Sequence, residues 1–397
     1  MATVFIGTTK VALPDGTAAA PAITGTDTDS GMFFGTNIVG LATNGVAAVS
    51  VNSSLITTFN STGALTLNIG TTAQRPTATT GQLRFSSSNT NLEYYNGTAW
   101  FGVTGERSGG TQKAIFGYGA IVILTPVSMS NLVSNTGVVA ADVTGVGTAR
   151  YALAAAGYGT DKAIFGYGSD GVSVYYSLTN LVSNTGVVAT NTTGVGTARD
   201  ALAATSYGSD TAIFGFGSTP TALSITNLVS NTGVVATDTT GVGTARDALA
   251  ATSYGADKAI FGYGYVAAVS SITNLVSNTG VVATDTTGVG TARYGLAAAT
   301  YGSGKAIFGY GYTTAVVSMT NLVSSTGVVS ADVTGVGTAR QGPAAASYGV
   351  DKALFGYGFD SFSLSITNKV SNLGTVATNT TGVGTDRFYL AAAGYST

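Results

Sequence analysis

Lys258-Ala-Ile-Phe-Gly-Tyr-Gly264 is the stretch that decides the fold, because it returns along the chain with little change. Its copies begin at Lys113, Lys162, Thr211, Lys258, Lys305 and Lys352, with spacings of 49, 49, 47, 47 and 47 residues. A second motif, Thr-Gly-Val-Gly-Thr-Ala-Arg, ends at Arg150, Arg199, Arg246, Arg293, Arg340 and, with Asp386 in place of Ala, Arg387. A period of this length indicates that each copy is one supersecondary unit, and six copies fill residues 107–397.

Each copy reads as four short strands. Between successive arginines, apolar or β-branched blocks alternate with Gly, Asp and Asn turn signals, as at Leu249–Tyr254, Lys258–Tyr263, Ser270–Ser277 and Val281–Thr284. Such blocks are typical of strands, and no window has sustained helical periodicity. Four strands per repeat is the content of a β-propeller blade, so we predict an all-β fold with a six-bladed propeller over residues 107–397.

The two ends of the repeat array are out of phase in a way that favours ring closure. The first aromatic strand, Lys113–Gly119, lacks the small-residue strand that precedes every later copy, and the last such strand, Leu390–Tyr395, has no aromatic strand after it. Pairing of these two segments would complete the last blade and leave no exposed sheet edge. An open solenoid would need distinct capping repeats, and the sequence contains none.

The order of arginine, small-residue strand, aromatic strand and Gly-x-Gly resembles the kelch-type propeller repeat. The chain departs from that pattern, because the kelch Gly-Gly pair is replaced by Gly117-Tyr118-Gly119 and its equivalents, and the usual blade Trp is missing. The resemblance implies propeller architecture and no particular activity.

Residues 1–106 do not match the repeat and read as short strands and turns. Asn96-Gly97 lies between two aromatic runs, which is a strong hairpin signal. Three segments, Pro21–Gly31, Thr72–Pro76 and Tyr95–Trp100, are similar to modules of tailed-bacteriophage tail fibres and other virion appendages. This resemblance covers residues 15–103. It implies a β-rich, homotrimeric attachment or shaft region over residues 1–106 that contacts other virion proteins.

Composition excludes several functions. The chain has no Cys and no His, which removes disulfides, thiolate metal sites and imidazole-based triads, and it lacks the loop signatures of calcium sites. A net charge of -2 without a basic run argues against nucleic-acid binding. No apolar segment is long enough to span a membrane, and Met1–Gly16 does not read as a signal peptide. We therefore expect no cofactor or metal. We also expect a virion protein that is made in the host cytoplasm and released by lysis.

The six phase-locked arginines raise the possibility of a glycosidase, because sialidase propellers use an arginine cluster. Both glutamates, Glu93 and Glu106, precede the repeats, so paired-carboxylate hydrolysis would have to use Asp alone. Groups that recur in every blade are expected to be structural, with the Asp or Asn eight residues before each Arg as a possible partner. Gly166–Gly171 matches a dinucleotide fingerprint, but no helix pattern follows it, so we interpret it as a turn.

The repeats differ most between Gly-x-Gly and the next Thr-Asn, and at the residue after each Arg. Variable loops on a rigid scaffold are where binding specificity usually resides, and exposed aromatic rings can stack on sugars. Six aromatic residues in these loops are therefore candidate ligand-binding residues: Tyr175, Tyr176, Tyr265, Tyr312, Phe359 and Phe362. Drift at positions that only fill an outer strand is the alternative explanation.

Together these features predict a non-enzymatic virion appendage, a tail fibre or similar structure, whose propeller binds a host-surface receptor such as a glycan. The main alternative is a purely structural decoration of the capsid, neck or tail. A polysaccharide depolymerase is a more distant one.

Overall fold

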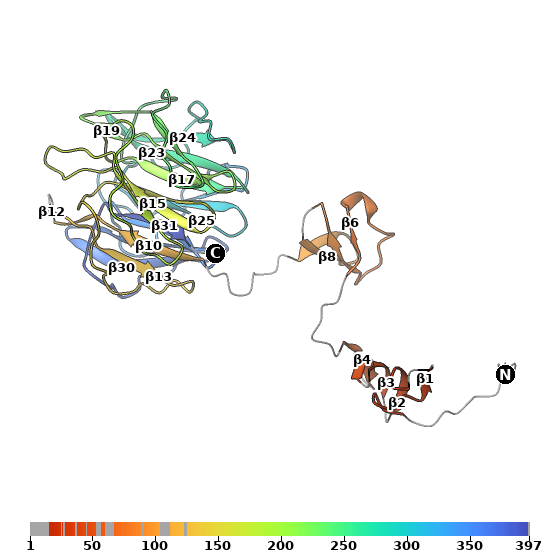
Figure 1. The fold of residues 1–397 in the computed structure, drawn as a ribbon. Coiled ribbons are helices and arrows are strands. Elements are labelled where there is room, and N and C mark those ends of the chain that lie inside the picture. Colours follow the sequence, from red (N-terminus) through yellow and green to blue (C-terminus); the bar gives the residue numbers. More distant parts are fainter. Residues whose placement is uncertain are drawn as a thin grey trace. The chain divides into compact units, whose positions relative to one another are not determined.

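The computed structural model describes residues 16–24, 26, 28–35, 38–44, 46–52, 57–59, 67–88, 91–103, 112–122 and 125–395. The chain is all-β and forms two compact units, Met1–Gly105 and Glu106–Thr397 (Figure 1). Within the described ranges, the single helical element is the 3-10 turn η1 (Thr72–Gln74), and none of the sheets closes on itself. A search of these ranges finds no helix with the length and apolarity needed to cross a membrane.

Unit 1 contains two small sheets. The first is antiparallel in chain order and consists of β1 (Ile23–Thr24), β2 (Gly31–Gly35), β3 (Ile38–Thr43), β4 (Val46–Asn52) and β5 (Thr57–Phe59). The second consists of β6 (Ile69–Gly70), β7 (Leu83–Ser86), β8 (Asn91–Tyr95) and β9 (Trp100–Val103), with β6 parallel to β7.

A hairpin and a buried ion pair organise the second sheet. The predicted Asn96-Gly97 hairpin is confirmed: β8 pairs with β9, and the Asn96 side chain accepts hydrogen bonds from the backbone N–H groups of residues 98 and 99. On β8 the Glu93 carboxylate is buried and lies 2.7 Å from Arg75 and 3.2 Å from Arg84. Glu93 is thus held within unit 1 by two arginines.

Unit 2 contains six three-stranded antiparallel sheets, each with an inner, a middle and an outer strand. The inner strands are β14 (Ala154–Tyr158), β17 (Ala203–Tyr207), β22 (Ala250–Tyr254), β25 (Ala297–Tyr301), β28 (Ala344–Tyr348) and β31 (Ala391–Tyr395). Their middle partners are β15 (Lys162–Gly166), β18 (Thr211–Gly215), β23 (Lys258–Val266), β26 (Lys305–Gly309), β29 (Lys352–Phe359) and β10 (Lys113–Gly117). The outer strands are β16 (Thr179–Val182), β21 (Thr226–Val229), β24 (Ala268–Val276), β27 (Thr320–Val323), β30 (Ser363–Val370) and β13 (Ser130–Val133). Two short hairpins, β11 (Ala120–Val122) with β12 (Thr125–Pro126) and β19 (Ser218–Thr219) with β20 (Thr221–Ala222), extend the connections.

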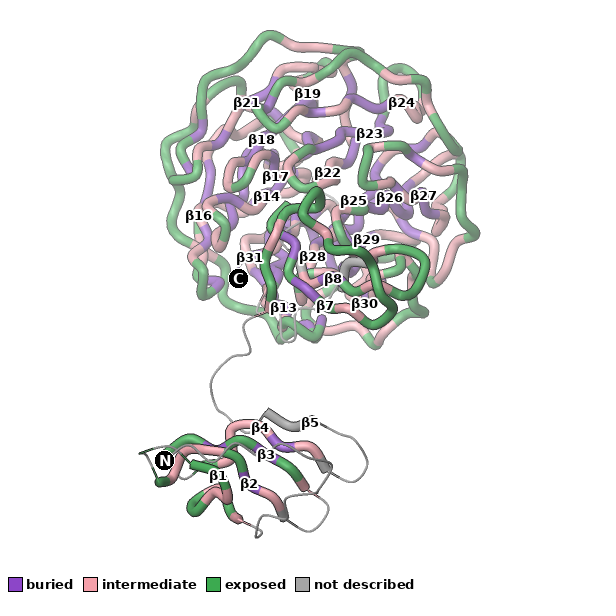
Figure 2. The backbone as a smooth tube through the Cα atoms, turned by 90° about the vertical axis from the view of Figure 1, so that its right-hand side faces the viewer, coloured by how far each residue is buried: buried purple, intermediate pink, exposed green. Residues whose placement is uncertain are grey.

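The last strand of the chain pairs with the first strand of unit 2, as the sequence predicted. β31 is antiparallel to β10, with Ala393 opposite Ile115. Figure 2 shows the inner strands near the centre of unit 2 and the outer strands at its rim. At one end of the inner strands, backbone hydrogen bonds of 2.7–2.8 Å run in a closed cycle through six residues: Ala152, Tyr389, Gly342, Gly295, Ala248 and Ala201. This cycle of hydrogen bonds links the segments that precede the six inner strands.

Adjacent sheets pack through a phenylalanine on a glycine. The Phe165 ring of β15 lies against Gly117 of β10, where a Cβ atom would come within 2.6 Å of the ring. The same contact recurs in every repeat and ends with Phe116 against Gly356, which again closes the cycle. This contact explains why the aromatic strand ends in Gly: any side chain there would force the sheets apart.

The predicted fourth strand of each repeat is reduced to isolated bridges, such as those from Val182 to Val188 and from Thr179 to Thr192. The buried side chain of Asn180 explains this difference. Its amide nitrogen donates a hydrogen bond to the backbone carbonyl of Ala189 at 2.9 Å. In a continuous strand this carbonyl would instead accept a hydrogen bond from a backbone N–H group of the neighbouring strand. The outermost segment therefore follows the sheet without forming a regular strand.

Candidate functional site

Unit 2 has two distinct ends. We call the end with the short inner-to-middle connections the turn face, and the end with the middle-to-outer connections the variable face. β10 begins at the turn face, where the backbone carbonyl of Gln112 accepts a hydrogen bond from Gly349, and β31 ends there. The variable face carries the loops in which the repeats differ.

The repeated arginines are fully buried between adjacent sheets. The guanidinium of Arg246 lies 4.4 Å from the ring centroid of Phe216 in the preceding sheet. It donates to the carbonyl oxygens of Tyr263 at 2.8 Å and Thr244 at 3.0 Å, and to Oδ1 of Asn274 at 2.6 Å. The ring and Asn contacts recur at the five equivalent residues Arg150, Arg199, Arg293, Arg340 and Arg387. We call this repeated unit the arginine framework.

Burial lowers the pKa of Arg246 to about 10, with the charge of Asp285 acting in the opposite direction. The guanidinium therefore stays protonated at neutral pH and needs its hydrogen-bond partners. Because all six side chains are buried, they are not presented to a ligand at the surface. This supports a structural role for the arginines.

The Gly-x-Gly motif serves the same framework. Tyr263 adopts φ +65° and Gly264 φ +108°, so two successive residues are left-handed. The left-handed Tyr or Phe recurs in all six repeats, at Tyr118, Tyr167, Phe216, Tyr263, Tyr310 and Tyr357. In each case the ring lies against the arginine that follows it along the chain, which offsets the backbone cost of this conformation.

The expected pairing of each arginine with the carboxylate eight residues before it is wrong. Asp285 accepts hydrogen bonds from the hydroxyl of Thr244 at 2.6 Å and from Asn274 at 2.9 Å. Asn274 in turn accepts from Arg246, whose Nη1 lies 3.9 Å from Asp285, so the carboxylate belongs with the preceding arginine rather than with Arg293. The loop that contains Asp285 crosses from one sheet to the next. Residue spacing alone therefore does not reveal which arginine lies near the carboxylate.

The predicted aromatic residues separate into groups on the variable face. Tyr265 is 41% exposed, and it and the half-buried Tyr312 both contact Tyr294, with ring centroids 5.6 Å and 5.5 Å apart. Phe359 packs on Phe388 at 5.2 Å in a second cluster. Phe362 is 80% exposed beside a groove of about 710 Å³ that Val122 and Asp386 also line. Tyr175 and Tyr176 are half-buried in the loop between β15 and β16, where Tyr175 bridges to Ser169.

Residues that follow the arginines bring these loops together. Each forms a backbone bridge with a residue of the neighbouring loop, and we call the six bridged pairs the crown: Tyr151–Ser169, Asp200–Ser218, Asp247–Tyr265, Tyr294–Tyr312, Gln341–Phe359 and Phe388–Ala120. Side chains of directly paired residues lie on the same side of the strands, so each pair presents two side chains together. The first three pairs therefore combine aspartates and serines with two tyrosines, and the last three pairs are largely aromatic.

Two carboxylates occupy the polar part of the crown. The hydroxyls of Ser169 and Ser218 donate to Asp200 at 2.7 Å and 3.3 Å. Burial raises the pKa of Asp200, an effect that the two serines oppose and the charge of Asp247 adds to. Burial also raises the pKa of Asp247. Both carboxylates are therefore partly desolvated, and a cation or a hydroxyl donor would stabilise their charged form.

Tyr389 is the one residue with a large side chain in the hydrogen-bonded cycle of six residues, whose other members are Ala or Gly. Its ring carbons come within 3.0 Å of the Cβ that Gly342 lacks, and its hydroxyl within 3.3 Å of the Cβ that Gly295 lacks. The corresponding residues in three other repeats are alanines. Burial raises the pKa of Tyr389, and the charges of Tyr294, Tyr151 and Asp247 add to it. Tyr389 thus lies among the crown residues, in space that the two glycines leave open.

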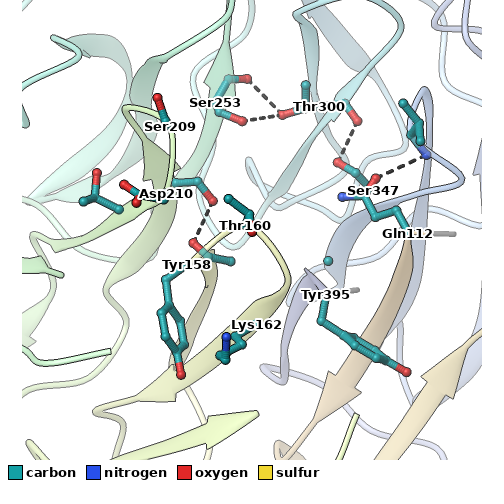
Figure 3. A pocket seen from close by; sticks show the side chains of 15 residues that line it. Gln112, Tyr158, Thr160, Lys162, Ser209, Asp210, Ser253, Thr300, Ser347 and Tyr395 are labelled. Carbon is teal, nitrogen blue, oxygen red and sulfur yellow. Dashed lines mark hydrogen bonds between the residues drawn. The ribbon is translucent and has the colours of Figure 1, made fainter. Parts of the chain in front are cut away.

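Cavities run along the inner strands. One cavity, of about 270 Å³, opens at the turn face, and Figure 3 shows Lys162, Asp210 and Gln112 around it. The residues lining it include hydroxyl side chains that form hydrogen bonds with one another or with the neighbouring strand. Thr300 Oγ1 lies 2.8 Å from Ser253 Oγ, and the Ser347 hydroxyl donates to the Thr300 carbonyl at 2.9 Å (Figure 3). At the opposite end a cavity of about 80 Å³ is lined mainly by leucines, Ala, Gly and Tyr389. The polar and apolar ends are thus chemically distinct.

Asp200, Asp247, Tyr294 and Tyr389 are site residues that the sequence analysis did not select. Their signal was present in part, because the residue after each arginine varies among otherwise similar repeats. Within the described ranges, no group of three or more His, Cys, Asp or Glu side chains could hold a metal ion. A scan against protein-family models matches no family, and a search of curated proteins finds no match.

Proposed function

We propose that the chain is a virion appendage protein of a tailed bacteriophage, and that its unit 2 binds a host-surface glycan through the variable face. In this proposal unit 2 is a six-bladed kelch-like propeller, and residues 1–106 attach it, as a homotrimer, to other virion proteins. The observation that carries the binding role is the crown, where near-identical repeats differ and place aromatic rings beside carboxylates.

Three features support the propeller assignment. Six sheets of the same strand order follow one another, the backbone hydrogen bonds at their inner ends run in a closed cycle, and β31 joins β10. Class averages of the purified protein in electron micrographs should show six lobes in unit 2. Five or seven lobes would contradict the assignment.

The position of the first and last strands supports the variable face as the binding face. β10 begins and β31 ends at the turn face, so the variable face lies at the opposite end of unit 2 from both. A glycan is the best-matched ligand, because Tyr rings offer stacking surfaces and Asp and Ser offer hydrogen-bond partners for hydroxyls.

The test is a double variant of the full chain, Tyr265→Ala with Tyr312→Ala. We expect it to fold as the wild type does and to bind host cells at least about tenfold more weakly, because it loses most of the aromatic surface around Tyr294. The measurement is saturable binding of labelled protein to cells, with the thermal midpoint as the folding readout.

Val234→Ala with Val281→Ala is the matched control, since each valine is 65% exposed and lies in the turn that follows an outer strand at the turn face. Unchanged cell binding by the tyrosine variant would remove these loops from the site. Failure of the folded wild type to bind host cells would favour a purely structural decoration of the particle.

A further inference from the structure

We propose that the crown selects glycans that carry an ammonium group, with Asp247 and the tyrosines around Tyr294 as the recognition residues. This inference rests on the proposed glycan binding and adds the charge class of the ligand. It assigns a role to Asp200 and Asp247, which the aromatic candidates did not include.

The aromatic half of the site is a continuous surface of three tyrosines. Tyr265 and Tyr294 pack at 61° and Tyr294 and Tyr312 at 52°, so the rings present faces and edges in different directions. Tyr265 is 41% exposed and the other two are half-buried. Tyrosine faces attract cations through the ring quadrupole, and the attraction is stronger when the cation is desolvated.

A carboxylate lies directly beside this surface. Asp247 and Tyr265 exchange two backbone hydrogen bonds, of 2.9 Å and 3.0 Å, so their side chains extend from the same side of the paired segments. Burial raises the pKa of Tyr294 and of Tyr389, and the charge of Asp247 adds a smaller increase to both. An ammonium group over the tyrosines would therefore also meet a negative charge.

Asp200 adds a second negative charge to this part of the crown. Asp200 accepts hydrogen bonds from Ser169 and Ser218; burial raises its pKa, and repulsion from the charge of Asp247 raises it further. A ligand cation between them would relieve that repulsion, whereas a carboxylate or phosphate would increase it. The site therefore discriminates by charge in addition to shape.

The surrounding loops carry no exposed cationic side chain. The connections of the variable face, 117–130, 143–153 and their equivalents, contain the six buried arginines and no Lys. The same connections hold five aspartates: Asp170, Asp200, Asp247, Asp360 and Asp386. Five lysines begin the middle strands at the turn face instead, at Lys113, Lys162, Lys258, Lys305 and Lys352. An anionic glycan therefore finds no exposed counter-charge at the crown.

The experiment compares three sugars of one ring size on the full chain: glucosamine, N-acetylglucosamine and glucuronate. Affinities are measured by ligand-observed NMR at about pH 6, where the glucosamine amine is protonated. We expect glucosamine to bind about tenfold more tightly than N-acetylglucosamine, because an ammonium beside a partly desolvated carboxylate gains about 1.4 kcal/mol. Glucuronate should bind most weakly.

Asp247→Asn should abolish the preference for glucosamine over N-acetylglucosamine. Asp257→Asn is the matched control, because it removes the same charge from a turn-face residue that accepts a hydrogen bond from Asn278; it should keep the preference. Equal affinities of the two amino sugars, no binding of glucosamine, tighter binding of glucuronate, or a preference that survives Asp247→Asn would each overturn the inference.

Host-cell binding by the same preparation separates this inference from the proposed function. If the protein binds cells but shows no ammonium preference, the charge selection is wrong and glycan binding stands. If the protein prefers glucosamine but does not bind cells, the crown is an ammonium-sugar site and the receptor role is wrong.

Discussion

The arginine framework and the crown are built from neighbouring residues of the same repeats, yet they differ in how much the repeats vary. Arg246 and its equivalents keep the same Asn and aromatic partners around the whole unit. The very next residue reads Tyr, Asp, Asp, Tyr, Gln and Phe in the six copies. The difference teaches that one set of contacts holds the sheets together, which leaves the adjacent side chains free to differ.

The largest expected effect comes from breaking the closure that both regions share. Truncation after Tyr389 removes β31, which exposes the edge of β10 and opens the hydrogen-bonded cycle next to Tyr389. We expect the truncated chain to lose the folded state of unit 2 and to aggregate, because an unpaired inner edge is a template for other strands. Size-exclusion chromatography and the near-ultraviolet signal of tyrosine measure this; a monomeric truncated chain with native tyrosine dichroism would contradict the closure.

The second test breaks the framework at one repeat. Arg246→Ala leaves Asn274 Oδ1 and the carbonyls of Tyr263 and Thr244 without their buried donor. We expect a loss of about 3–5 kcal/mol in the free energy of unfolding of unit 2, the range for breaking a buried charged network. Denaturant unfolding followed by tyrosine dichroism measures this loss, while fluorescence of Trp100, the one Trp of the chain, reports on unit 1.

Asp247→Asn is the matched variant at the adjacent crown residue. It should change the unfolding midpoint little, since Asp247 is outside the framework's hydrogen bonds. Equal losses at residues 246 and 247 would show that framework and crown are one energetic unit.

The smallest expected effect tests whether the negative charge of a crown carboxylate stabilises or destabilises the fold. Burial raises the pKa of Asp200 above the ordinary 3.8, so the folded state binds its proton more tightly than the unfolded state. Above its raised pKa, ionised Asp200 therefore lowers the free energy of unfolding. Below pH 3.8 the side chain is protonated in both the folded and the unfolded state, so this destabilisation disappears. We expect Asp200→Asn to gain about 0.5 kcal/mol at pH 7 and to lose that gain as the pH falls.

Asp238→Asn should show the opposite sign. Hydrogen bonds from Thr197 and Asn227 lower the pKa of Asp238 although burial acts against them. Its ionised form stabilises the fold, so the variant should be less stable at pH 7, and the difference should vanish as the pH falls through the lowered pKa. The same sign for both variants in thermal unfolding between pH 3 and 7 would contradict the assigned environments.

The strand order within each repeat, the turns and the pairing of β31 with β10 could be predicted, because they depend on local patterns and on the phase of the array. The Asp285 partner could not, since Asn274 and a loop between sheets join it to the preceding arginine. The reduced fourth strand depends on the buried Asn180 amide in the same way. Tyr294 and Asp247 escaped selection because their proximity to Tyr265 arises from bridges between loops that are distant in the sequence.

Competition for virion adsorption tests the central claim most directly. Purified full-length protein is added to host cells before the virus, next to the same amount of the Tyr265→Ala, Tyr312→Ala variant with an unchanged thermal midpoint. We predict that the wild type binds saturably and blocks adsorption, and that the variant does neither. Equal blocking by both proteins, or no blocking by the folded wild type, would contradict receptor binding through the variable face.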